Sequence, residues 1–147
     1  MKITLCGSIA FIDEMLAAKN TLESTGHEVQ MPPLEILDEQ GKAMPVKEYY
    51  ALRKTTNETE GWIWDAKEQA MRNHFEKVLW ADAILVLNHD KNGILNYIGA
   101  NTLLEMGLAF HHRKKIFLLK PIPELSYKEE ILGMHPVIIH QNLSLLS

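Results

Sequence analysis

Cysteine is almost absent from this sequence, which contains only Cys6. A single cysteine excludes a disulfide within the chain. The first residues also lead directly into an apolar run, without the charged leader and long apolar segment of a secretory signal. We therefore expect a cytoplasmic protein.

Long apolar runs and clusters of basic residues are missing as well. No apolar run approaches the roughly 18 to 20 residues that a membrane-spanning helix needs. The 15 Lys and Arg residues are dispersed, and the net charge is -4, so the basic patch of a nucleic-acid-binding protein is not evident. A small molecule is the expected partner, and neither nucleic acid nor membrane is expected.

Size and composition favour one globular domain. A chain of 147 residues with 46% hydrophobic residues can bury a substantial core. We expect a single domain over residues 1–147, with an irregular insert at about 32–65.

Apolar strand-like runs alternate with segments of helical periodicity. Strands are predicted at 2–8, 27–33, 83–88, 115–121 and 136–140, and helices at 10–26, 46–54, 62–80, about 98–112 and 127–134. Because parallel strands need crossover connections, this alternation predicts a parallel sheet with helices on both faces. The expected fold is α/β, a flavodoxin-like (Rossmann-like) three-layer sandwich with five parallel strands in the order 2-1-3-4-5.

Two polar loops leave the carboxyl ends of the first and third predicted strands. In such sheets ligands bind at these ends, near the switch point in the strand order. Gly7 and Ser8 lie in the first loop, where backbone N–H groups could hold a phosphate or a sugar hydroxyl. The alternative is a plain turn in which Ser8 caps the following helix.

Glu105 is the only charged residue between Leu103 and Phe110 in the predicted helix 98–112. Helical side chains lean toward the N-terminus, so Glu105 should point over Asn101 and Thr102 toward the ligand crevice. These two side chains and the helix dipole could keep the carboxylate ionised, as a nucleophile requires. A solvated or salt-bridged glutamate is the alternative interpretation.

Three runs resemble the nucleoside 2-deoxyribosyltransferase superfamily: GANTLLEMGLA (99–109), LCGS (5–8) and WADAILVLN (80–88). That superfamily includes the deoxynucleoside 5'-monophosphate N-glycosidases, whose first loop carries a run like Cys6 to Ile9. The resemblance implies that Glu105 attacks C1' of a (deoxy)ribose, releases the base and forms a glycosyl ester. It also implies that Asp82 orients the substrate or handles the proton of the departing base.

Three positions depart from the pattern of these families. Thr4 stands where the families carry a tyrosine in the first strand. Gly99 stands where the families carry Asp or Ser, and Ala10 stands where the monophosphate glycosidases carry an arginine. Asn96 and Tyr97, in the loop before the helix, could substitute for the missing contacts. The predicted substrate-binding residues are Gly7, Ser8, Ile9, Asn96, Tyr97, Gly99, Asn101 and Thr102.

The remaining candidates are less specific. No His, Cys, Asp or Glu grouping has the spacing of a zinc or calcium site, so no metal and no cofactor are expected. His74 lies on the apolar face of its helix, where a core histidine is more common than a ligand or base. Tyr49, Tyr50, Trp62 and Trp64 could form a lid over a nucleobase, or could pack the insert against the domain or another chain.

The sequence thus predicts an enzyme that cleaves or transfers the N-glycosidic bond of a (deoxy)nucleoside or its 5'-monophosphate through Glu105. The resemblance implies a homodimer or higher homo-oligomer in which a neighbouring chain helps complete the site. The alternative is a non-catalytic nucleotide-binding or sensing module of the same fold. A response-regulator-like domain fits less well, because the first strand ends in CGS and lacks an acidic pair for magnesium.

Overall fold

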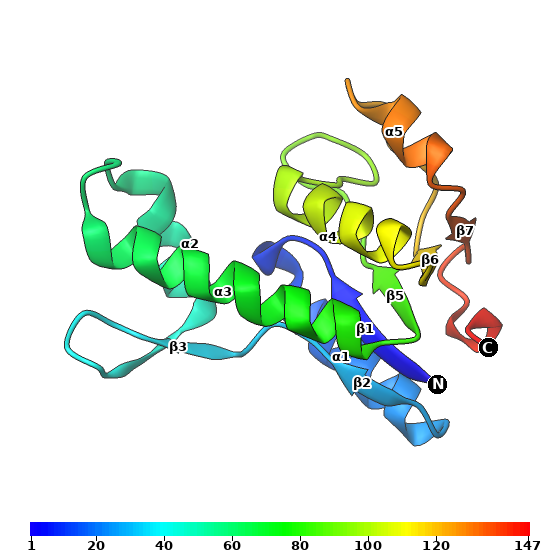
Figure 1. Ribbon diagram of the computed structural model, residues 1–147, viewed down its shortest axis with the longest axis horizontal. Helices are drawn as coiled ribbons and strands as arrows, with labels where there is room; N and C mark the ends of the chain where they lie inside the picture. The colour runs from blue at the N-terminus through cyan, green and yellow to red at the C-terminus, as the bar shows by residue number, and fades with distance from the viewer.

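The computed structural model describes residues 1–147 and is built around a parallel sheet (Figure 1). Its strands are β1 (Lys2–Cys6), β2 (Glu28–Gln30), β5 (Ala83–Val86), β6 (Lys115–Leu118) and β7 (Val137–Ile138). They lie in the order β2-β1-β5-β6-β7, and all neighbouring pairs are parallel. Numbered among themselves, these strands have the order 2-1-3-4-5. The predicted flavodoxin-like α/β fold is therefore confirmed.

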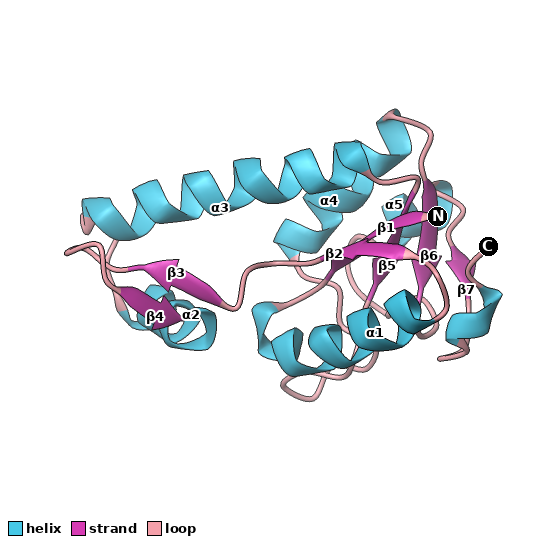
Figure 2. Ribbon diagram, turned by 90° about the horizontal axis from the view of Figure 1, so that it is seen from below, coloured by secondary structure: helices cyan, strands magenta, loops and turns pink.

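Helices cover both faces of the sheet (Figure 2). On one face lies α1 (Ile12–Ser24), and on the other lie α3 (Gly61–Trp80), α4 (Ala100–His111) and α5 (Lys128–Gly133). None of the helices combines the length and apolar character needed to cross a membrane.

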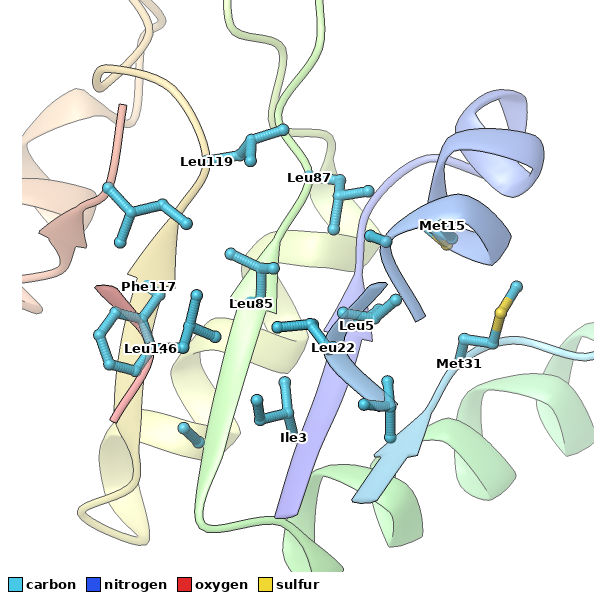
Figure 3. Close-up of a cluster of buried hydrophobic side chains, with 14 of the residues drawn as sticks. Ile3, Leu5, Met15, Leu22, Met31, Leu85, Leu87, Phe117, Leu119 and Leu146 are labelled. Atoms are coloured by element: carbon cyan, nitrogen blue, oxygen red, sulfur yellow. The ribbon is translucent and has the colours of Figure 1, made fainter. Parts of the chain in front are cut away.

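The core under α1 is formed by alternate residues of the central strands. Ile3, Leu5 and Leu85 point to this face and pack against α1 (Figure 3). Met15 and Leu22 of α1 belong to the same cluster and are fully or almost fully buried. Because side chains alternate along a strand, the residues between these core residues point to the opposite face of the sheet.

The second core lies between the sheet and α3, α4 and α5. Ile84 and Val86 of β5 pack there with Val78 of α3 and Met106 of α4. Strand β5 is thus buried on both faces, which explains why its sequence is continuously apolar. Cys6, the last residue of β1, also faces this side and is fully buried.

An arm projects from the sheet body where the sequence suggested an irregular insert (Figures 1 and 2). We define the arm as β3 (Glu35–Leu37), β4 (Ala43–Pro45), α2 (Val46–Thr55) and the start of α3. The two strands form an antiparallel hairpin. Each strand has only three residues, too few to show an alternating pattern, so the hairpin was not evident from the sequence.

The arm has a small hydrophobic core of its own. Met44, Tyr49 and Ile63 form this cluster, with Trp62 and Trp64 packed against it. The hydroxyl group of Tyr49 also donates a hydrogen bond to the carbonyl oxygen of Ile63 at 2.6 Å. The arm is therefore held on α3 by packing and by this buried bond.

Asn88 joins the chain segments that follow β5 and β6. Its side chain is fully buried. Nδ2 donates to the carbonyl oxygens of Lys120 and Pro121 at 2.9 and 3.0 Å, and Oδ1 accepts from the N–H of Lys120 at 2.8 Å. This side chain satisfies backbone groups at the carboxyl ends of the strands, where the ladder stops.

Asn88→Ala should lower the free energy of unfolding by about 2 to 4 kcal/mol, because it leaves buried backbone groups unpaired. Urea denaturation measures this loss. Gln40→Ala, in the exposed turn between β3 and β4, is the control and should change stability by less than about 0.5 kcal/mol. A loss for Asn88→Ala as small as that of the control would contradict the structural role of this side chain.

Candidate functional site

A cleft of about 720 Å³ opens at the carboxyl ends of β1 and β5. Its walls come from the loop after β1, from α2 in the arm, from α3, and from the segment that leads into α4. Most of the predicted site residues line it: Gly7, Ser8, Ile9, Tyr97, Gly99, Asn101, Thr102 and Glu105. The two loops predicted to face each other therefore contribute to one cleft.

Asp82 does not reach this cleft. It directly precedes β5, and its exposed carboxylate accepts a hydrogen bond from the backbone N–H of Lys2 at 2.8 Å. Both residues lie at the amino ends of their strands, the edge of the sheet opposite to Glu105. We therefore correct the sequence-based expectation: Asp82 ties the starts of β1 and β5 together and cannot contact a substrate held by Glu105.

Asn96 also lies outside the residues that line the cleft. Its backbone has a φ of 57°, in the left-handed region, and its N–H donates to Oδ1 of Asp90 at 2.9 Å. Asparagine tolerates this conformation better than most residues. The structure thus gives Asn96 a role in shaping the loop before α4.

Gly99 and Tyr97 share one small space at the start of α4. A Cβ atom on Gly99 would lie 2.8 Å from the hydroxyl oxygen of Tyr97 and 3.1 to 3.2 Å from its ring. A side chain at position 99 would therefore require Tyr97 to shift. In this structure the ring of Tyr97 occupies the space beside Gly99.

Glu105 lies at the base of the cleft with only 2% of its surface exposed. Nδ2 of Asn101, one turn earlier in α4, donates to Oε2 of Glu105 at 3.2 Å, as the helix geometry predicted. Nζ of Lys67 donates to Oδ1 of Asn101 at 3.3 Å. A cation on α3 is thus connected to the carboxyl group through one amide. Thr102 is buried nearby but does not bond the carboxyl group.

Cys6 and His74 meet Glu105 beneath the cleft. Nε2 of His74 is 3.7 Å from Oε1 of Glu105 and 3.6 Å from Sγ of Cys6. The three residues come from α4, α3 and β1, which are distant in the sequence. Its position on an apolar helix face indicated that His74 is buried, but only the packing of α3 shows that it touches Glu105.

Burial determines the charge state of this cluster. It raises the pKa of Glu105 to about 8, although the charge of Lys67 and contact with Cys6 lower it. It lowers the pKa of His74 to about 4, with Lys77 adding to the effect, and raises the pKa of Cys6. Burial therefore favours a protonated Glu105 carboxyl group at neutral pH. The expected stabilisation of the ion by Asn101 and the helix dipole is smaller than the cost of burial.

Cys6, His74 and Glu105 are also residue types that bind zinc. Their ligand atoms all lie within 4.8 Å of one another, so the cluster could hold a metal ion. Sequence spacing did not indicate this grouping, because it is assembled from three separate elements. A metal ion would have to displace the protons that burial favours on Cys6 and Glu105.

Positive charge dominates the rest of the cleft. Glu105 is the only carboxylate among the lining residues. Burial, together with the nearby charge of Arg53, lowers the pKa of Lys67 to about 8. The cleft is thus cationic although the chain has a net charge of -4. The lining cations are Arg53, Lys54, Lys67, Lys77 and Lys91.

The aromatic residues of the insert divide between the arm and the cleft. Trp62 and Trp64 pack in the arm, and Nε1 of Trp64 donates to the carbonyl oxygen of Asn57 at 3.1 Å. Tyr49 belongs to the arm core but also lines the cleft, as does Tyr50. Packing therefore accounts for the tryptophans, whereas Tyr50 is available to a ligand.

Comparison with known proteins gives matches at the level of structure. No protein-family model and no curated protein matches the sequence. A 2-deoxyribosyltransferase from Bacillus psychrosaccharolyticus superposes with a TM-score of 0.53 at 19% identity, over 85% of this chain and 76% of the other. The CMP N-glycosidase BcmB from Clostridium botulinum gives 0.53 at 16% identity, over 99% and 98%. This chain shares their fold. The resemblance predicted from the sequence thus holds for the fold, and the roles of individual residues rest on the site itself.

Relative to the unchanged protein, Glu105→Gln should become more stable as the pH rises from 4.5 to about 8. Folding raises the pKa of Glu105 from 4.5 to about 8, so its contribution is full below 4.5 and is lost as the pH rises, by up to about 1.4 kcal/mol per pH unit. Glutamine does not titrate. Urea denaturation of both proteins across this range measures the effect. A constant difference would contradict a carboxyl group that is protonated by burial.

Proposed function

We propose that this protein cleaves or transfers the N-glycosidic bond of a (deoxy)nucleoside or its 5'-monophosphate, with Glu105 as the nucleophile. The supporting observation is a buried carboxyl group at the base of a cleft whose volume suits a small organic ligand. The fold is also shared with one protein named as a 2-deoxyribosyltransferase and one named as a CMP N-glycosidase.

The proposed reaction has two steps at the same carbon. An oxygen of ionised Glu105 bonds to C1' of the sugar while the C1'–N bond breaks, and the base leaves with that electron pair and takes a proton from solvent. Water or a second base then attacks C1' and frees the carboxylate. Water gives hydrolysis, and a second base gives transfer.

Both oxygens of Glu105 have a protein neighbour, but only one of them accepts a hydrogen bond. Oε2 accepts from Asn101, and Oε1 faces the imidazole of His74. We propose that these contacts are positioning contacts, because an attacking oxygen must keep its direction toward C1'. Lys67 favours the ionised form by its charge.

Glu105→Gln should reduce base release by about a thousandfold or more, because the amide cannot form the glycosyl ester. The assay incubates the protein with ribo- and deoxyribonucleosides, their 5'-monophosphates and a free base, and separates the bases by chromatography. Glu76→Gln, an exposed change elsewhere on α3, is the control and should keep full activity. Full activity in Glu105→Gln would exclude this nucleophile.

The rate should increase with pH up to about 8, because Glu105 must lose its proton before it attacks. The pH profile of kcat/KM measures the pKa in the free enzyme. Lys67→Met should shift this profile to higher pH, since the charge of Lys67 lowers the pKa of Glu105. A profile that is flat between pH 6 and 9 would argue against rate control by Glu105.

A non-catalytic nucleotide-binding module is the second candidate. It is favoured by the position of Asp82, which leaves Glu105 as the only carboxylate in the cleft. In that case nucleotides bind without turnover, and their affinity is unchanged in Glu105→Gln.

We also propose that the chain forms a homo-oligomer. Leu95, Leu104 and Phe110 lie in or near α4 and are 67%, 53% and 52% exposed. Leu104 also lines the cleft, so a second chain covering this helix would lie beside the site. Sedimentation of the purified protein measures the state of association, and a monomer at assay concentration would contradict it.

A further inference from the structure

Three cations surround a single aromatic ring in the cleft. The guanidinium carbon of Arg53 lies 5.2 Å from the ring centroid of Tyr50, and Nζ of Lys54 and Nζ of Lys91 each lie 4.9 Å from it. Positive charges gathered around one ring repel one another. The ring offsets part of this repulsion through cation–π contacts, but an anion among the three would offset more.

The protein does not supply that anion. Arg53, Lys54 and Lys91 take part in none of the salt bridges, and no carboxylate other than Glu105 lines the cleft. Nε of Arg53 is also buried without a hydrogen-bond partner. Since buried N–H groups are nearly always paired, this donor points to an acceptor from outside the chain.

Lys91 connects the arm to the loop after β1. Its Nζ donates to Oγ of Ser8 at 2.9 Å and contacts the hydroxyl group of Tyr50. Burial raises the pKa of Tyr50, but hydrogen bonds with Lys91 and Ser8 and the charges of Lys91 and Lys54 together leave the pKa below its ordinary value. The environment that favours a phenolate here also favours a phosphate oxygen.

We propose that Arg53, Lys54 and Lys91 form an anion site that binds the phosphate of a nucleotide substrate. The inference rests on the proposed function for the sugar and the base, and adds that the substrate is a nucleoside 5'-phosphate. Guanidinium and ammonium groups are the usual phosphate ligands in proteins.

The anion site and Glu105 both act on the pKa of Lys67. Burial lowers this pKa most, the charges of Arg53 and Lys54 lower it further, and the charge of Glu105 raises it. In a nucleotide the 5'-phosphate and C1' are joined by one ribose ring. A phosphate fixed by the arm would therefore restrict where C1' lies relative to Glu105.

The test measures binding in the Glu105→Gln background, so that ligands are not consumed. The probes are adenosine, guanosine, cytidine, uridine and thymidine with their 5'-mono- and 5'-diphosphates, titrated by calorimetry. For the preferred base, the phosphates should bind about tenfold or more tightly than the nucleoside, as expected for charge-assisted bonds. Lys54→Gln and Lys91→Gln should each remove several-fold of this gain, measured in each variant as the ratio of nucleotide to nucleoside affinity.

Lys42→Gln is the matched control, because Lys42 is exposed in the hairpin turn of the same arm and does not line the cleft. It should leave the gain from phosphate intact. Lys54 makes no hydrogen bond, so Lys54→Gln tests the site without loosening the fold. A second measurement uses the protein in which Arg53, Lys54 and Lys91 are unchanged. Added NaCl and inorganic pyrophosphate should weaken its binding of nucleotides more than its binding of nucleosides.

Equal affinity for nucleosides and nucleotides would overturn the anion site, as would a phosphate gain that persists in the Lys54→Gln/Lys91→Gln double variant. Other outcomes would overturn the proposed function without overturning the anion site, or the reverse. Nucleotides that bind through the arm but are never cleaved by the unmutated enzyme would overturn the glycosidase and keep the anion site. Cleavage of nucleosides without any gain from phosphate would keep the glycosidase and overturn the anion site.

Discussion

The burial of Glu105 is the constraint on which the rest of the site depends. A carboxyl group that is 2% exposed loses almost all of its contact with water. It therefore remains protonated or acquires partners that accept its charge. Asn101 and the distant charge of Lys67 provide partial compensation, and His74 and Cys6 fill the remaining space with neutral groups. These contacts come from β1, α3 and α4, so the geometry of the carboxyl group is set by the packing of the whole second core.

Helix α3 links this buried cluster to the arm. Ile63, near its start, belongs to the arm core, and Val78, near its end, belongs to the core of the sheet. Lys67 and His74 lie between them and face the cleft. One continuous helix of 20 residues thus carries the arm, the cation beside Asn101 and the histidine beside Glu105. The distance between the arm and the base of the cleft is consequently fixed by a rigid element rather than by a loop.

The sequence predicted the features that depend on local pattern. Alternation of apolar runs indicated the strand order, and the isolated Glu105 indicated the carboxyl group at the ligand edge. Features that depend on packing between distant segments could not be predicted from the sequence. His74 touches Glu105 because α3 packs beside α4, and this packing cannot be read from the sequence. The expectation that Glu105 is ionised fails because the pattern does not show how deeply the carboxyl group is buried. The family resemblance along the sequence implied a substrate role for Asp82. The register of β1 and β5 instead places Asp82 at the opposite edge of the sheet.

The positive charge of the cleft was also not evident from the composition. The chain is acidic overall, and its basic residues are dispersed along the sequence. Folding brings several of them to one surface, while most carboxylates lie elsewhere. Local electrostatic potential, rather than net charge, decides which ligand a cleft attracts.

The contact between Gly99 and Tyr97 has a consequence for how this site can change over evolution. Because a Cβ atom at position 99 would lie 2.8 Å from the tyrosine hydroxyl, a side chain at position 99 depends on what position 97 holds, whereas a smaller residue at position 97 leaves Gly99 unaffected. A mutational path toward a polar side chain at position 99 must first shorten or move Tyr97. The order of changes at the two positions therefore matters, because position 97 has to make room before position 99 can gain a side chain.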